Sequence, residues 1–183
     1  QTPSPEAFLE AACLSDIHRR FYEQLPESLR HVSGENGLKK AVTPGQLRQA
    51  GEEVIVGQHL PPEGSQLSSY LDRFSEAYKI DYLHGQKRVI AAMAAHHRFT
   101  WIHPFLDGNG RVGRLHTDLF LKHIGLGACG IWCLSRGLAR NNEDYKAALA
   151  RADQVRQGDH DGRGALSEKY LIKFCEFMIR TAI

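Results

Sequence analysis

The chain contains few of the residues that mark specialised protein classes. It has four cysteines and two methionines among 183 residues, and neither sign of charge dominates, because 21 Asp and Glu accompany 23 Lys and Arg. A formal net charge of +2 is too small to indicate a nucleic-acid-binding surface, and no basic block suits a membrane surface. We therefore expect neither nucleic acid nor a membrane among its partners.

The cysteines make no CxxC pair and no zinc-ligand spacing; they are Cys13, Cys129, Cys133 and Cys175. This pattern favours reduced, mostly buried thiols, and we expect a cytoplasmic location. No apolar run reaches membrane-spanning length, and the start, QTPSPEAFLEAA, has no signal-peptide pattern. Because no initiator methionine is present, we expect a fragment of a longer chain, with further segments upstream.

The apolar residues predict a mainly α domain covering residues 1–183. They make up 42% of the chain and recur at helical spacing in six segments: 8–25, 67–83, 86–99, 111–124, 142–155 and 166–183. Only residues 53–62, within EEVIVGQHLPP, are strand-like, because a β-branched run precedes a glycine and two prolines. We expect one short β-hairpin there.

The stretch TWIHPFLDGNGRVGRLH concentrates the residues that carry chemistry. His103 precedes Pro104, which disfavours the α conformation in the residue before it, so the preceding helix must end near His103. The imidazole is then on a loop, where it can act as a neutral base. Gly108, Asn109 and Gly110 precede a periodic helix, whose first amides lack internal partners and favour an anion. They are a candidate phosphate cradle.

Two cations and a carboxylate flank this cradle. Arg111 and Arg114, at i and i+3, lie on one side of the helix and suit a polyphosphate. Asp107 would repel phosphates unless a cation lay between them, and Mg²⁺ favours one or two carboxylates plus phosphate oxygens. Simpler interpretations exist residue by residue: Asp107 or Asn109 as a helix N-cap, and ion pairs of Arg111 with Asp107 and of Arg114 with Asp118. Only the functional interpretation explains all of them together, as transfer from a nucleoside triphosphate to a hydroxyl.

At these residues the sequence resembles the Fic family, whose signature is HPFx[DE]GNGRxxR. His103 to Arg114 match it without departure, and LSRGLARNNEDYKAAL resembles the segment that follows in the family. The resemblance implies a mainly helical Fic domain that transfers AMP from ATP to a Ser, Thr or Tyr hydroxyl of a target protein and releases pyrophosphate.

The resemblance also implies a role for each motif residue. His103 takes the proton of the attacking hydroxyl, Phe105 packs inward and Asp107 binds Mg²⁺. Gly108, Asn109 and Gly110 hold the phosphates, and Arg111 and Arg114 grip the β- and γ-phosphates. VIVGQHLPP resembles the family's flap, so Val56, Gly57, Gln58 and His59 would lie over the nucleotide, and the target would dock on the flap. Tyr145 and Asn142 would border the adenine, although helix packing explains both equally well.

Many members of the family carry an inhibitory helix with the motif [ST]xxxE[GN]. Residues 2–6 have its spacing, but Ala7 follows and two prolines interrupt it. We expect the inhibitory helix upstream of this fragment; a separate antitoxin-like partner is the alternative.

Other functions stay open. A Doc-like kinase transfers the γ-phosphate, but such members alter the glycine that is intact here as Gly110. Removal of AMP uses the inhibitory Glu, which this chain lacks. A regulatory module that only binds ATP would need neither His103 nor Asp107.

Two metal signals are weaker. Residues 157–168 imitate a calcium loop, but Gln157 replaces the first aspartate and Gly164 an apolar residue. His116 and His123 share a helix face without a third ligand, which argues against zinc.

Overall fold

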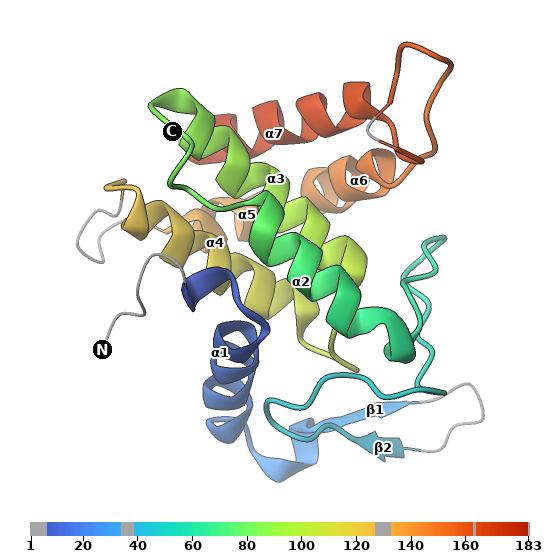
Figure 1. Cartoon of the computed structure of the whole chain (residues 1–183). Coiled ribbons are helices and arrows are strands. Elements are labelled where there is room, and N and C mark those ends of the chain that lie inside the picture. Colours follow the sequence, from blue (N-terminus) through green and yellow to red (C-terminus); the bar gives the residue numbers. More distant parts are fainter. Residues whose placement is uncertain (1–6, 34–38, 127–132, 163, 183) are drawn as a thin grey trace.

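Helices dominate the described part of the chain. The structure, a computed structural model, describes residues 7–33, 39–126, 133–162 and 164–182. Within them lie seven α-helices (Figure 1): α1 Ala11–Glu23, α2 Leu67–Ala77, α3 Gln86–Ile102, α4 Asn109–His123, α5 Leu134–Arg140, α6 Asn142–Ala152 and α7 Glu168–Ala182. Three 3-10 turns accompany them: Ala7–Leu9, Glu27–Leu29 and Gly64–Gln66. The prediction of a mainly α fold is confirmed.

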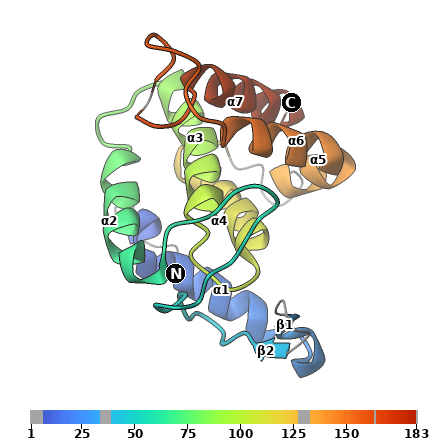
Figure 2. The same ribbon diagram turned by 90° about the vertical axis from the view of Figure 1, so that its right-hand side faces the viewer.

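Helix α3 forms the centre of the molecule. It packs against α2, α4 and α7, and α2, α3 and α4 run side by side (Figure 2). Its buried residues include small, aromatic and histidine side chains rather than a single apolar stripe: Ala92, Met93, Ala95, His96, His97, Phe99 and Ile102. A helix covered on several sides buries residues all round, so α3 carries polar groups into the core that need internal partners.

Proline lies just beyond the ends of two helices, α1 and α3. α1 ends at Glu23, ahead of Pro26, as expected. α2 ends at Ala77 and α6 at Ala152, so the predicted ends at 83 and 155 are wrong. α3 ends at Ile102, immediately before His103, which confirms the end predicted from Pro104, although the periodic segment alone reached only residue 99.

Helix α5 was not predicted. Its seven residues are too few to show a period, and Gly137 lies at its middle. A Cβ atom there would lie 2.7 Å from the carbonyl oxygen of Thr181, so the glycine is needed for α5 to pack against α7. Asp118 of α4 accepts hydrogen bonds from the Leu134 amide at 2.9 Å and the Ser135 hydroxyl at 3.1 Å. The Asp118 carboxylate thus accepts the hydrogen bonds of the donors at the start of α5 instead of pairing with Arg114.

The β-hairpin lies elsewhere than expected. β1 His31–Ser33 and β2 Lys39–Ala41 pair antiparallel, with His31 opposite Ala41. Residues 53–62 form no strand; they contain one isolated bridge, in which Val56 and His59 exchange two backbone hydrogen bonds of 3.0 Å. The prolines that follow donate no backbone hydrogen bond, so pairing does not extend beyond this turn.

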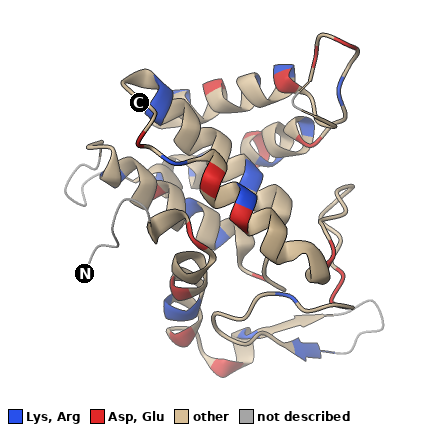
Figure 3. Ribbon diagram, in the orientation of Figure 1, with Lys and Arg blue, Asp and Glu red and all other residues tan. Residues whose placement is uncertain are grey.

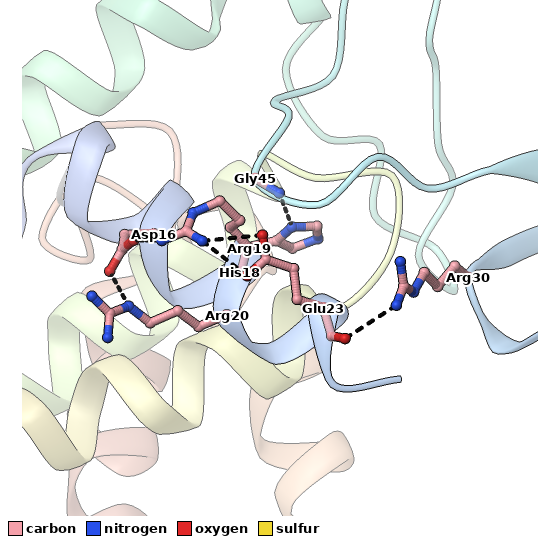
Figure 4. A network of polar contacts seen from close by, with 7 residues as sticks. All are labelled: Asp16, His18, Arg19, Arg20, Glu23, Arg30 and Gly45. Atoms are coloured by element: carbon pink, nitrogen blue, oxygen red, sulfur yellow. Dashed lines mark hydrogen bonds and ion pairs between the residues drawn. The ribbon is translucent and has the colours of Figure 1, made fainter. Parts of the chain in front are cut away.

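Charged side chains of both signs are spread over the described chain (Figure 3), although α3 and α5 carry only basic residues. The densest network is on α1, where Asp16 pairs with Arg19 and Arg20, and Arg19 also pairs with Glu23 at 2.9 Å (Figure 4). These pairs are largely exposed, so each contributes at most about 0.5 kcal/mol to stability. No described helix is long and apolar enough to cross a membrane. Cys129 and the partial inhibitory motif at residues 2–6 lie outside the described residues.

Candidate functional site

A cavity of about 450 Å³ opens where the α3–α4 connection, the 53–62 segment and α6 meet. Its lining residues are Val56, Gly57, His59, Thr100, His103, Gly110, Arg114, Asn142, Tyr145, Lys146, Leu149, Ala150 and Asp153. The volume suits a nucleotide-sized ligand. Most of the residues expected to contact the nucleotide or its metal ion meet here, but five of them do not line the cavity: Gln58, Asp107, Gly108, Asn109 and Arg111.

His103 ends α3 in a left-handed conformation, with φ 51° and ψ 58°, and its amide bonds the carbonyl of Phe99 at 3.1 Å. Its Nδ1 lies 3.3 Å from the carbonyl oxygen of Thr100. A carbonyl only accepts, so Nδ1 carries the proton and Nε2 keeps its lone pair. Burial lowers the pKa of His103 to about 4, and the charge of Arg48 acts in the same direction. The ring is therefore neutral at physiological pH, in the tautomer that a base needs.

Helix α4 begins beside this ring with amides that face no internal acceptor. Gly108 is the N-cap residue, with φ 84°, and has no side-chain cap, so the simpler interpretation of Asp107 or Asn109 as N-cap is wrong. The backbone N–H groups of Asn109, Gly110 and Arg111 have no hydrogen-bond acceptor among the described residues. The start of α4 thus has the free donors and the dipole that attract an anion.

Asn109 supports the loop from inside. Its side chain is 1% exposed, accepts a hydrogen bond from the Phe105 amide at 2.9 Å and donates one to the Phe105 carbonyl at 2.7 Å. Phe105 is fully buried, as expected. The side-chain amide of Asn109 therefore shapes the loop and is not free to bind an anion itself.

Asp107 is held by a residue of α1. The Tyr22 hydroxyl donates to its Oδ2 at 2.6 Å, and Arg111 Nη2 reaches the same oxygen at 2.6 Å. Burial alone would raise the pKa of Asp107, but the bonds from Tyr22 and the Gly108 amide and the charge of Arg111 outweigh it and lower the pKa. The carboxylate is thus ionised and oriented, while Arg111 is directed away from the cavity.

His18, one turn before Tyr22, holds the same loop by its backbone. The Gly45 amide donates to His18 Nδ1 at 2.8 Å (Figure 4), so Nε2 carries the proton and donates to the Asp107 carbonyl at 3.1 Å. The ring stacks between those of Tyr22 and Phe105, with centroids 4.3 and 4.1 Å away. Helix α1 therefore positions both the main chain and the carboxylate of Asp107.

Arg48 connects the loop with the 53–62 segment. Its guanidinium is 2% exposed in the core and donates to the carbonyls of His103 at 2.8 Å, Pro62 at 2.9 Å and Glu52 at 3.0 Å. His59 adds a second tie, because its Nε2 donates to the Trp101 carbonyl at 2.7 Å. Both ends of the segment are thus tied to the end of α3, which holds Val56 and Gly57 over the cavity.

The residues fit a magnesium ion only together with a phosphate ligand. Among the described residues no group of three His, Cys, Asp or Glu side chains could hold a metal ion by itself. Asp107 supplies one ionised carboxylate next to free helix amides, which matches the preference of Mg²⁺ for few carboxylates plus phosphate oxygens.

The weaker metal signals have structural explanations. Asp161 accepts hydrogen bonds from the Gln157 amide, the Ser167 hydroxyl and the Lys169 amide, at 2.7 to 2.9 Å. The Lys169 amide contributes most to lowering its pKa to about 2. The carboxylate ties the loop to the start of α7. The Nε2 of His116 is occupied as well, since it donates to the Phe8 carbonyl at 3.0 Å.

Tyr22, His18 and Arg48 were not singled out in the sequence. The first two lie one turn apart on the inner face of α1, and the helical period shows only that they face the core. Nothing near Arg48 in the sequence reveals that its guanidinium bonds the carbonyl groups of Pro62, Ile102 and His103 as well as that of nearby Glu52.

Taken together, the fold and site define a mainly helical protein with an anion-binding helix start beside a neutral histidine, under a short turn. The sequence pattern of the Fic/DOC family matches residues 8–121, so the chain belongs to the Fic/DOC family.

Two relatives named "Protein adenylyltransferase Fic" illustrate the similarity. The protein of Drosophila willistoni is 36% identical over 110 residues, 60% of this chain and 19% of the relative. That of Culex quinquefasciatus is 33% identical over 118 residues, 64% of this chain and 20% of the relative. The match therefore spans about a fifth of these relatives' length.

Solved structures share the fold. A Fic family protein from Desulfovibrio desulfuricans G20 superposes with a TM-score of 0.65 at 22% identity, covering 96% of this chain and 45% of the other. A Fic domain containing signaling protein from Bacteroides thetaiotaomicron VPI-5482 gives a TM-score of 0.57 at 18% identity, covering 96% and 66%.

Proposed function

We propose that the chain is the catalytic domain of a Mg²⁺-dependent protein adenylyltransferase. The observation that carries the proposal is the shared cavity, in which the His103 ring, the free start of α4 at Gly110 and the Arg114 side chain meet. A base beside an anion-binding helix start suits nucleotidyl transfer to a hydroxyl. The names of the curated relatives support AMP as the group transferred.

In this mechanism the chain acts by positioning and charge neutralisation. The α4 amides and Arg114 would bind the phosphates of ATP, and Asp107 would hold Mg²⁺, which neutralises phosphate charge when bound. His103 Nε2 takes the proton as the acceptor hydroxyl bonds to the α-phosphorus, while the bond to the β-phosphate oxygen breaks and pyrophosphate leaves. Arg111 would have to leave Asp107 to reach the phosphates, because it is paired with that carboxylate and does not line the cavity.

The residues of the 53–62 segment would cover the nucleotide, and the target protein would bind to this segment. Val56, Gly57 and His59 line the cavity, and Gln58 is directed elsewhere. Ile55 and Leu60 are 66% and 67% exposed, so the outer face of the segment is apolar and accessible to a target. Asn142 also lines the cavity, which keeps it a candidate for nucleotide contact.

The proposal is tested with ATP labelled at either the α- or the γ-phosphate. The protein is incubated with Mg²⁺ and each nucleotide, and label is followed on the chain itself and on lysate proteins. Label from the α-position supports adenylylation, and label from the γ-position would indicate a kinase instead. ATP binding without any label would point to a binding module.

A matched pair of histidine variants assigns the base. His103→Ala should keep ATP affinity within about twofold and lose transfer by about 100-fold or more, as expected for removal of a general base. His84→Ala removes an exposed imidazole just ahead of α3 and should transfer at the wild-type rate. Unchanged transfer by His103→Ala would contradict the assigned role.

A further inference from the structure

A buried series of polar side chains lies behind Arg114. His96 of α3 is fully buried, with Nδ1 2.7 Å from the Thr117 hydroxyl of α4 and Nε2 2.7 Å from the Tyr145 hydroxyl of α6. Arg114 and Tyr145 both line the cavity, and the charge of Arg114 acts on the Tyr145 hydroxyl. Three helices thus contribute to one continuous path from the core to the cavity.

The direction of each hydrogen bond follows from a carbonyl group at the inner end. The Thr117 hydroxyl donates its single proton to the Gly113 carbonyl at 2.8 Å, so it must accept from His96 Nδ1. Burial lowers the pKa of His96 to about 3, and the charge of Arg114 acts in the same direction, so the ring is neutral. Its Nε2 therefore accepts from the Tyr145 hydroxyl, which leaves the lone pairs of the Tyr145 oxygen for the Arg114 guanidinium beside it in the cavity lining.

This arrangement changes the role expected for Tyr145. Tyr145 is 4% exposed and belongs to the hydrophobic core, and its hydroxyl is already bonded to His96. Burial raises the pKa of Tyr145 to about 12, so the hydroxyl keeps the proton that it donates to His96. The hydroxyl is therefore engaged by His96 and lies beside Arg114, and it is not free to bond the adenine ring.

We infer that Tyr145 and His96 are positioning residues, which hold the Arg114 guanidinium at the cavity and make the site selective for nucleoside triphosphates over monophosphates. An arginine side chain loses considerable rotamer freedom when it binds a ligand, and a partner that already fixes it reduces this loss. The inference rests on the proposed function, in which Arg114 contacts the β- and γ-phosphates of ATP.

The test compares the affinities for ATP and AMP. Tyr145→Phe removes only the hydroxyl and should weaken ATP binding about tenfold, the size expected for a hydrogen bond to a charged group, while AMP affinity changes less than about twofold. His96→Leu should have the same effect. His96→Gln, which can still accept a hydrogen bond from Tyr145, should keep the wild-type ratio of ATP affinity to AMP affinity. Isothermal titration calorimetry gives both constants without requiring turnover.

Two controls separate positioning from general damage. Tyr78→Phe removes a hydroxyl that bonds the Ala94 carbonyl away from the cavity lining, and it should leave the ratio unchanged. In an Arg114→Gln background, Tyr145→Phe should cause no further loss, because it acts through Arg114. Equal weakening of ATP and AMP, or an additive loss in the double variant, would overturn the inference. Failure of the wild-type chain to bind ATP would contradict the proposed function itself.

Discussion

At the scale of single residues, His103 shows how surroundings change an ordinary side chain. In the sequence it is an imidazole with a pKa near 6.5. In the structure, burial lowers its pKa to about 4, and a bond to the Thr100 carbonyl selects the tautomer. The ring is therefore a weaker base than an exposed histidine, but it is already deprotonated over the whole physiological range.

The pH dependence of transfer should report this lowered pKa. Since the base must be unprotonated, kcat/KM should stay level as the pH falls through 6.5 and decline only as it approaches about 4. Initial rates with labelled ATP from pH 8 to pH 4.5 provide the measurement, with Trp fluorescence to confirm that the protein stays folded. A decline centred at 6.5 in folded protein would show that His103 is exposed to solvent in the working enzyme.

At the scale of elements, the start of α4 contains two glycines with different roles. Gly108 has φ 84°, and a Cβ atom there would lie 2.6 Å from Tyr22 Cε2, which is too close for either group. Gly110 has ordinary helical space, and its nearest neighbour would be Arg114 Nη1 at 3.4 Å. The first glycine lets α1 approach the loop, whereas the second keeps the cavity open.

Alanine at each position should separate stability from binding. Gly108→Ala should lower the free energy of unfolding by about 1–3 kcal/mol, because left-handed backbone strain adds to the contact with Tyr22. Gly110→Ala should leave stability unchanged or raise it by up to about 1 kcal/mol, since alanine favours the helix, but weaken ATP binding. Urea denaturation and ATP titration of both variants provide the test; the reverse pattern would contradict these assignments.

At the scale of the whole molecule, the core contains more histidine than a helical bundle needs for packing. His96 and His116 are fully buried on α3 and α4, and burial lowers their pKa values to about 3 and about 4. Together with His103, they stay neutral in the folded chain at a pH where the unfolded chain would protonate them. The core is thus coupled to pH.

Acid should therefore destabilise the fold well before its carboxylates protonate. Below pH 6.5 the unfolded state binds more protons, so the free energy of unfolding should fall until the pH reaches about 4, by up to about 1.4 kcal/mol per pH unit for each histidine. Urea denaturation at pH 7, 6 and 5 measures this slope. In His116→Phe the free energy of unfolding should depend less steeply on pH, because the unfolded state takes up one proton fewer. A free energy of unfolding that does not change with pH would refute the coupling.

Local sequence was enough for the helical class, most helix positions and the motif from His103 to Arg114, because helical period and the backbone preferences of proline and glycine act over a few neighbouring residues. It did not locate the β1–β2 hairpin, α5, or the supports of the site on α1 and at Arg48. Those depend on contacts between segments far apart in the chain, such as Tyr22 with Asp107 and His96 with Tyr145. Only the packed core brings these groups together and removes them from water, and that burial decides their partners, their tautomers and their charge.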